Sequence, residues 1–314
     1  MATSGSVNFS VSRDDLILAA YQHVGTLGEG DTPSSAQTTE AALLLNMIVK
    51  ARMADGMPAW ALKRGYILPF TGASSISLGG STQAVTSYVT TTTTAATAAA
   101  GSTVTLTSVT GISNGYNIGI WCTDNTIQWT TVNGAPAGLV VTLTDALTVG
   151  CASGARIFVY QTGNRITKPL RILQVNIENV DTDVSRPINA ISSQEYYDLG
   201  ERTVASTPNQ YMVDVQLSTT DFYIYPRMAT TDEIFSITFH RPFEDFDASS
   251  DTPDFPQEWY LALMLELAVL LGPKAGLSIE ERKSNIMLSQ YYTGLALSNG
   301  TPEQSFYIQP EGRC

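Results

Sequence analysis

Apolar residues near the N-terminus recur at the three- and four-residue spacing of a helix. Leu16 and Ile17 lie on the first such stripe, and Ser12 before them is a residue type that caps helix starts. A second stripe covers about residues 35–55, after glycines and a proline that interrupt the first. The pattern predicts two antiparallel helices at the start of the chain.

After these helices the periodicity changes to the two-residue alternation of strands. Tyr66, Leu68 and Phe70 alternate in this way and predict the first strand of the core. From residue 79 to residue 163, β-branched and aromatic runs are separated by turn sequences such as SNG and ASG. This spacing predicts a small antiparallel barrel or sandwich, inserted where added length costs little loop-closure entropy. The stretch TTTTTAATAAAG inside it is either a flexible linker or an edge strand.

Strand-like runs return between residues 164 and 250. Segments such as RILQVNIENV, YMVDVQL and IFSITFH predict a second antiparallel sheet, and QEYYDLG predicts a short helix between its strands. We expect the strand at Tyr66 to complete this sheet from the other side of the insert. The acidic, proline-punctuated connector RPFEDFDASSDTPDFP that follows is interpreted as a solvated linker.

The most apolar helix of the chain lies near the C-terminus. Its sequence is WYLALMLELAVLLG, from Trp259 to Gly272, and Glu266 interrupts it. The run is shorter than the roughly 20 residues that cross a bilayer. Because it is apolar around most of its circumference, it must be covered on more than one side. The pattern leaves open whether the chain itself supplies all of this cover or a neighbouring copy supplies part of it.

A last helix and a tail follow. Ser278 and Glu281 have the spacing of a capping box and predict a helix that extends to about residue 298. Residues 299–314 lack helical periodicity. Aromatic and aliphatic side chains of the helix and the tail are anchors of the kind that dominate interfaces, so we predict that they bind a partner. The predicted anchors are Tyr291, Tyr292, Leu295, Phe306, Tyr307 and Ile308.

Together these elements predict an α+β fold: a helical bundle with an antiparallel β region and an inserted small all-β barrel or sandwich module. The helix pair and first strand, the module, the β region, the C-terminal helices and the tail are expected at residues 1–78, 79–163, 164–250, 251–298 and 299–314.

Composition excludes some functions. The 314 residues carry a formal net charge of -12, which argues against a protein that grips nucleic acid, because phosphate binding needs clustered Lys and Arg. Three cysteines without metal-ligand spacing form a poor disulfide framework, so we expect synthesis in a reducing cytoplasm. The N-terminus shows no basic start followed by an apolar run, and no secretory signal is expected.

Candidate catalytic chemistry is sparse. His23 and His240 fall in unrelated elements and are interpreted as packing or surface residues. Asp254 and Glu258 stand four residues apart at a helix start, where the helix dipole explains acidic residues and a paired-carboxylate site is the alternative. The acidic connector lacks the glycine and the terminal glutamate of a helix-loop-helix calcium site. We therefore predict no catalytic, metal-binding or cofactor-binding residues, and no enzymatic activity.

Three stretches, in this order, resemble one protein family. They are residues 12–70, the segment EYYDLGERTVASTPNQYMVD before DFYIYPRM, and ITFHRPFEDFD leading into DTPDFPQEWYLALMLELAVLLGPKAG. The chain resembles the head-to-tail adaptor proteins of short-tailed bacteriophages, which complete the head and stabilise packaged DNA. The resemblance covers the N-terminal 70 residues and about residues 165–298. The uncharged insert departs from the minimal family pattern.

The resemblance implies a structural virion protein of the portal vertex, synthesised in the cytoplasm of the bacterial host. Such proteins form a twelve-fold homo-oligomeric ring under the portal, connect the capsid to the tail, and act in genome packaging and DNA ejection. The six predicted anchors would bind the portal protein. The opposite face would receive a tail tube or nozzle protein. The insert would either decorate the outside of the ring or contact tail fibres. Double-stranded DNA would pass through the lumen without specific binding, and no membrane would be involved.

Two other functions stay open at this point. Tyr116, Trp121 and Trp129 in the threonine-rich module favour a carbohydrate-binding or adhesive virion protein. Asp254 and Glu258 would serve a cell-wall hydrolase.

Overall fold

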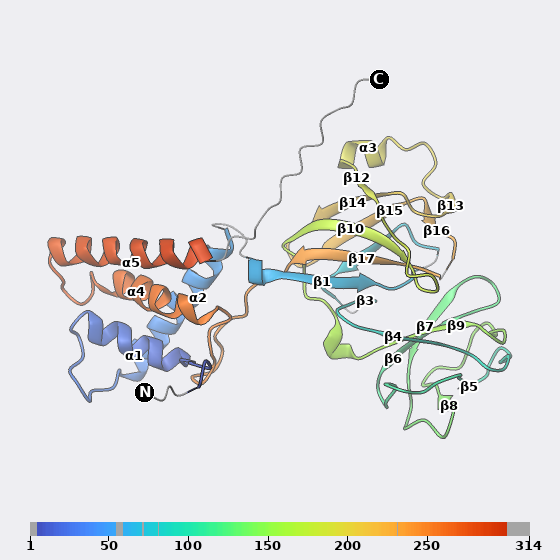
Figure 1. Cartoon of the computed structure of the whole chain (residues 1–314), viewed down its shortest axis with the longest axis horizontal. Helices are drawn as coiled ribbons and strands as arrows, with labels where there is room; N and C mark the ends of the chain where they lie inside the picture. Colours follow the sequence, from blue (N-terminus) through green and yellow to red (C-terminus); the bar gives the residue numbers. More distant parts are fainter. Residues whose placement is uncertain (1–4, 55–58, 71, 81, 231, 300–314) are drawn as a thin grey trace. The chain divides into compact units, whose positions relative to one another are not determined.

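The computed structural model describes residues 5–54, 59–70, 72–80, 82–230 and 232–299. The described residues form an α+β fold with five α-helices and several antiparallel sheets. The chain divides into two compact units, one with the long helices and one with the sheets (Figure 1). The helical unit consists of Met1–Ala61 with Phe243–Cys314, and the sheet unit consists of Leu62–Pro242.

The helical unit is organised around its most apolar helix, α4. Seven of the side chains of α4 are buried, and all of them except Leu265 share one hydrophobic core with side chains of α1 and α2. Helices α1, α2 and α5 all pack against α4. The elements of this unit are α1 (Arg13–His23), α2 (Ser35–Ala54), the 3-10 turns η1 (Ala59–Ala61) and η3 (Gln257–Trp259), α4 (Tyr260–Leu271) and α5 (Ile279–Asn299).

The connector before α4 is part of this core, so its interpretation as a solvated linker is wrong. Phe243, Phe246 and Phe255 are buried in it, and the rings of Phe243 and Phe255 lie 4.7 Å apart. Trp60 packs against both of these rings. The carboxylates between the phenylalanines suggested solvent exposure, but the phenylalanines bind the connector to the helices. The N-terminal helix pair was predicted correctly in position and length.

Two sheets form the main body of the sheet unit, where the sequence predicted one. The first has the order β11-β10-β17-β1-β3, so the N-terminal strand β1 does pair with strands from beyond the insert. Strand β1 ends at Ile67, earlier than predicted, and Phe70 reaches the core from the loop. The strands are β1 (Leu62–Ile67), β3 (Ala84–Val85), β10 (Arg171–Asn179), β11 (Ser185–Pro187) and β17 (Glu233–His240).

The second sheet has the order β12-β14-β15-β2, and a hydrophobic core joins it to the first. Ile237 and Phe239 enter this core from β17, and Phe222 and Ile224 enter it from β15. The alternation of β15 places every second residue in the core, which is the pattern of a strand with one buried face. The remaining elements of this body are β2 (Ser75–Leu78), β12 (Asn189–Ala190), α3 (Ser193–Tyr197), β13 (Ala205–Ser206), β14 (Gln210–Val215), β15 (Thr220–Tyr225) and β16 (Arg227–Met228).

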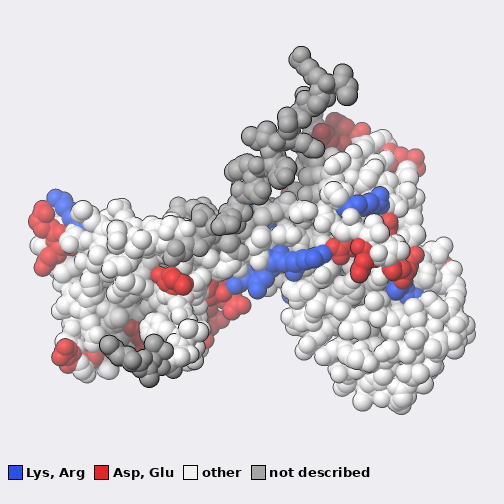
Figure 2. All heavy atoms as spheres, viewed as in Figure 1, with Lys and Arg blue, Asp and Glu red and all other residues white. Residues whose placement is uncertain are grey.

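The inserted module folds around its own hydrophobic core. Its sheets have the orders β4-β9-β6-β7 and β5-β8, and the first part of the threonine-rich stretch forms edge strand β4. Figure 2 shows the face of the module toward the viewer with hardly any coloured charge. The strands are β4 (Val89–Thr92), β5 (Thr103–Thr105), β6 (Asn117–Trp121), β7 (Ile127–Thr131), β8 (Val140–Thr142) and β9 (Arg156–Tyr160).

The module packs firmly against the body of the sheet unit. Phe158 of β9 is fully buried in a cluster that also contains Leu68 and Ile234 of the body. Arg156 of β9 forms an ion pair with Asp181 and lies 3.9 Å from Asp232. Apolar packing and charge pairing therefore hold the module in one position on the body.

Candidate functional site

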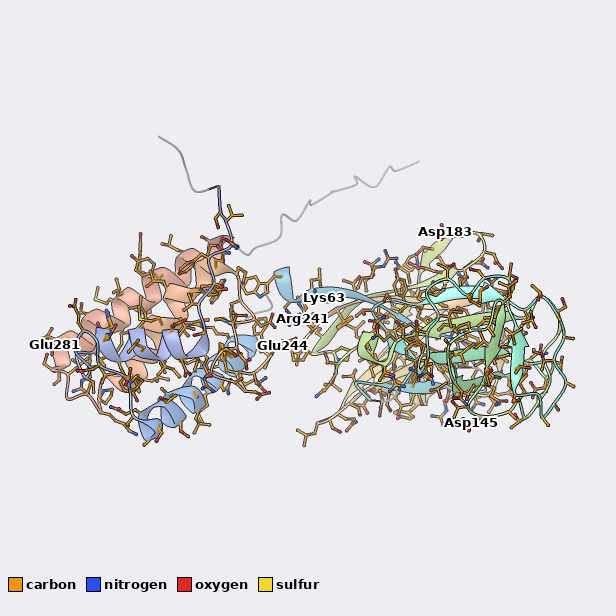
Figure 3. All side chains as sticks on the ribbon, turned by 90° about the horizontal axis from the view of Figure 1, so that it is seen from below. Lys63, Asp145, Asp183, Arg241, Glu244 and Glu281 are labelled. Carbon is orange, nitrogen blue, oxygen red and sulfur yellow. The ribbon has the colours of Figure 1, made fainter. Side chains whose placement is uncertain are left out.

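Helix α5 begins with the predicted capping box. Glu281, labelled at the start of α5 in Figure 3, accepts a hydrogen bond from the Ser278 amide (2.8 Å), and its own amide donates to Ser278 Oγ (3.3 Å). Hydrogen bonding from the Ser278 side chain, and then from the Ser278 amide, holds the pKa of the Glu281 carboxyl below its usual value, because it favours the charged form. The cap fixes where α5 starts and thus which of its faces meets α4.

One stripe of α5 faces the core of the helical unit. Ser289, Thr293 and Ala296 are buried along it, and Tyr292 packs against the core from its edge. The three predicted anchors on α5 are thus divided. Tyr292 belongs to the packing of the unit, whereas Tyr291 and Leu295 are 62% and 46% exposed. The rings of Tyr291 and Tyr292 meet edge to face with centroids 5.3 Å apart.

Two further apolar side chains join the exposed anchors. Met287 and Leu288 are 70% and 38% exposed and precede Tyr291 by one helical turn. Residues three or four apart lie on the same side of a helix, so Met287, Leu288, Tyr291 and Leu295 form one surface, here called the outer stripe. Single exposed apolar residues are ordinary, but a run of four on one helix face makes the outer stripe a candidate interaction surface. Met287 and Leu288 could have been assigned to this face from the sequence, because they precede Tyr291 by four and three residues.

The other predicted anchors, Phe306, Tyr307 and Ile308, lie outside the described residues. They follow α5 in sequence, seven or more residues beyond its end at Asn299.

A groove of about 680 Å³ lies in the helical unit between α2 and α5, with α4 as its floor. Met47 on its α2 wall and Leu270 on its floor are 56% and 46% exposed. The sequence indicated that α4 is covered on more than one side and left open what completes the cover, so it did not locate this groove. The exposed pair Leu43 and Met47, one turn apart on α2, was the available signal. The lining residues are Met47, Ile48, Ala51, Arg52, Glu266, Val269, Leu270 and Ser289.

An ion pair closes one end of the groove. Arg52 Nε donates to Glu266 Oε2 over 3.1 Å, and Arg52 Nη2 contacts the second carboxylate oxygen. Thr293 Oγ1 on α5 donates to the same oxygen over 2.8 Å. A two-point arginine–carboxylate contact is the strong form of such a pair, and it neutralises both charges in a mostly buried position. These contacts explain why a glutamate interrupts the apolar run: Glu266 of α4 links α2 and α5.

A second ion pair, between Glu40 near the start of α2 and Lys274 just after α4, is more exposed. Because Arg52 at the end of α2 meets the middle of α4, the two helices run antiparallel along the groove. The apolar lining thus lies between two neutralised charge pairs.

Two of the carboxylates considered for catalysis or metal binding, Asp251 and Asp254, accept hydrogen bonds from amides of the connector. Asp254 accepts a hydrogen bond from the Glu244 amide (3.1 Å), and Asp251 accepts from the amides of Asp247 (2.8 Å) and Ala248 (2.6 Å). These two amides lower the pKa of the Asp251 carboxyl. Across the described part of the chain, no three His, Cys, Asp or Glu side chains gather as metal ligands would.

The two histidines lie in different units. His23 Nε2 on α1 is 3.3 Å from Asn285 Oδ1 on α5. His240 is buried at the end of β17, where burial, and then the charge of Arg171, lower its pKa. Its imidazole is therefore neutral near pH 7.

The cysteines of the module are free thiols. Cys122 and Cys151 are both buried, and burial raises the pKa of the Cys122 thiol, which makes it a poor nucleophile. Cys314 lies outside the described residues.

The aromatic residues considered for sugar binding have packing roles. Trp129 lies across Gly119 of the neighbouring strand, where an added Cβ would come within 2.7 Å of its ring. Its ring also meets Tyr160 edge to face, with centroids 5.6 Å apart. Tyr116 and Trp121 pack against the core of the module. A sugar platform needs an open ring face, and all three rings are partly covered.

The negative charge of the chain is concentrated in the helical unit. This unit holds 17 acidic and 7 basic residues in its sequence, whereas the sheet unit holds 12 acidic and 10 basic residues. A nearly balanced sheet unit and an acidic helical unit both lack the excess of cations that phosphate binding requires.

Comparisons with known proteins identify no relative of the chain. None of the described helices is both long enough and apolar enough to cross a membrane. No protein-family model matches the chain, and a search of curated proteins finds no match.

Proposed function

We propose that the chain is a head-to-tail adaptor of a short-tailed bacteriophage, a structural virion protein without catalytic activity. In this proposal it forms a ring, dodecameric in the related family, under the portal and connects the capsid to the tail. The four long helices act as a bundle, and strands β4 to β9 act as a small inserted barrel or sandwich. The resemblance of residues 12–70 and 165–298 to that family is the starting point.

The single observation that carries the proposal is the outer stripe of α5. Met287, Leu288, Tyr291 and Leu295 present apolar and aromatic surface on the helix that leads directly to the tail. Aromatic side chains supply much of the binding energy of protein interfaces, because they bury a large area with few rotatable bonds. A portal subunit that covers this stripe would remove it from water and would contact the adjoining tail at the same time.

Charge supports the same role. An adaptor must let DNA slide through its lumen, and a wall with excess negative charge repels the phosphates. The helical unit has that excess. We propose that DNA passes this unit without specific contacts.

The test is a sedimentation assay of the full chain with its cognate portal rings. The double variant Tyr291→Asp with Leu295→Asp places two charges on the outer stripe and is expected to weaken the complex at least about tenfold, because each buried charge would lack a partner. Gln290→Asp, an exposed polar position on another side of α5, is the matched control and is expected to bind normally. Deletion of residues 299–314 is expected to weaken the complex as well.

Equal binding by the double variant and the control would show that the outer stripe does not contact the portal. Failure of the unaltered chain to bind portal rings at all would remove the adaptor role. The contacts do not favour the carbohydrate-binding and hydrolase alternatives, since the three aromatic rings of the module are engaged in packing and Asp254 accepts a hydrogen bond within the connector.

A further inference from the structure

The groove between α2 and α5 leaves part of the most apolar helix uncovered. Leu270 on its floor and Leu43 and Met47 on the α2 side are each about half exposed, although seven side chains of α4 are buried. Apolar surface of this kind is stabilised when another apolar group covers it. The groove lies on the side of α5 that carries Ser289 and Thr293, not on the side of the outer stripe.

The lining defines what the groove accepts. Met47, Ile48, Val269 and Leu270 offer apolar contacts, and Arg52 and Glu266 satisfy each other at one end. A charged ligand would meet no free opposite charge there, so an uncharged, apolar segment is the matching occupant. The volume is in the range of pockets that hold a few large side chains.

The sequence after α5 contains one such segment. Phe306, Tyr307 and Ile308 are three consecutive large apolar or aromatic residues, and the residues on both sides of them are polar. Gly300 follows Asn299 directly and Pro302 comes two residues later, and these residue types end helices and redirect the chain. The chain therefore has a means to turn back beside α5.

The distances permit this return. About 15 Å of helix separates Ser289 in the groove wall from the end of α5 at Asn299, at 1.5 Å per residue. Residues 300–306 in extended form span about 23 Å, at roughly 3.3 Å per residue. The tail of one chain is thus long enough to bring Phe306 to the groove of the same chain.

We propose that Phe306, Tyr307 and Ile308 occupy the groove between α2 and α5 of their own chain. A tethered segment has a millimolar effective concentration and loses no overall translational freedom on docking, so it competes well against the same segment of a second copy. The outer stripe stays open in this state. A partner that binds the tail must first compete with the groove, and this holds whether or not that partner is a portal.

The experiment is photocrosslinking in the full chain. Met47, at the groove rim, is replaced by p-benzoyl-phenylalanine, and the matched control places the same residue at Met287 on the outer stripe; both positions are exposed. Irradiation of the Met47 form is expected to link position 47 to a peptide from residues 300–314 within one chain. The yield is expected to fall at least tenfold when Phe306, Tyr307 and Ile308 are all changed to Ser.

Three outcomes would overturn the proposal: links to the tail that are as frequent from position 287, links only between two chains, or no link from position 47 to the tail. A second measurement covers the case in which the probe itself disturbs the groove. Hydrogen exchange of residues 300–314 in the unaltered chain is expected to be several-fold slower than in Leu270→Asp, and equal rates would contradict the proposal. Binding to portal rings is measured separately, so failure here is distinguishable from failure of the adaptor role.

Discussion

At the scale of single residues, the turn after β2 depends on a glycine. Gly79 has φ +94°, a region that L-residues rarely adopt, and an added Cβ would lie 2.7 Å from the Cα atom of Lys168. The Lys168 backbone cannot move away from the added Cβ as easily as the end of a flexible side chain could. The neighbouring Gly80 has no atom within 4 Å of the same added group. The fold therefore requires glycine at position 79, whereas position 80 has space for a side chain.

We expect Gly79→Ala to lower the free energy of unfolding of the sheet unit by more than about 2 kcal/mol, because strain and steric overlap add. Gly80→Ala is expected to stay within about 0.5 kcal/mol of the unaltered chain. Urea unfolding followed by circular dichroism measures both. Equal effects of the two substitutions would show that the turn relaxes around the added methyl group.

Some contacts of single residues could be predicted from the sequence, and others could not. The caps at Ser12 and Ser278 were predictable, because both partners of each capping box lie within one turn of helix. The pairing of Arg52 with Glu266 was not, since 214 residues separate the two. Local spacing identifies local bonds, and contacts between distant segments depend on the fold.

At the scale of elements, helices and strands were predicted more fully than their pairing. The strands of the module and of the β region lie close to the predicted runs, because alternation is a local property. Their division into two sheets was missed, because it depends on which strands exchange hydrogen bonds. Of the anchors predicted on α5, Tyr291 and Leu295 are exposed, while Tyr292 faces inward because it lies on the same side of α5 as Ser289.

The attachment of the module to the body makes an element-scale prediction. Phe158 of β9 is fully buried in the joint cluster, and Phe158→Ala is expected to destabilise the sheet unit by about 3–5 kcal/mol, because it removes buried area and leaves a cavity. Leu139→Ala, a half-exposed position of the module, is the control and is expected to have little effect. Chemical denaturation measures both free energies. A small effect of Phe158→Ala would mean that the module and the body are not held together by this cluster.

At the scale of the whole molecule, the two units differ in continuity along the chain. The sheet unit is one uninterrupted segment, Leu62–Pro242, with its own cores. The helical unit combines an N-terminal and a C-terminal segment, and α4 from the second segment supplies the centre of its core. Folding of the helical unit therefore requires both ends of the chain.

We expect residues 62–242, expressed alone, to fold cooperatively and to show the circular dichroism of a β-rich protein. Residues 1–61 alone are expected to lack stable helices, because isolated helices of this length are marginal without a packed face. Adding residues 243–314 is expected to restore helical signal. Stable helices in the N-terminal segment by itself would show that α4 is not needed for them.

The entry and exit of the module lie side by side. Residues 84–86 before it and 164–166 after it are joined by backbone hydrogen bonds, including Thr86 N to Asn164 O (2.7 Å) and Ile166 N to Ala84 O (2.9 Å). Residues 87–163 could thus be exchanged for a short turn, or for a different folded polypeptide with adjacent ends, without a change in the path of the flanking strands. This junction makes the chain a natural acceptor for foreign domains, whether by recombination or by engineering.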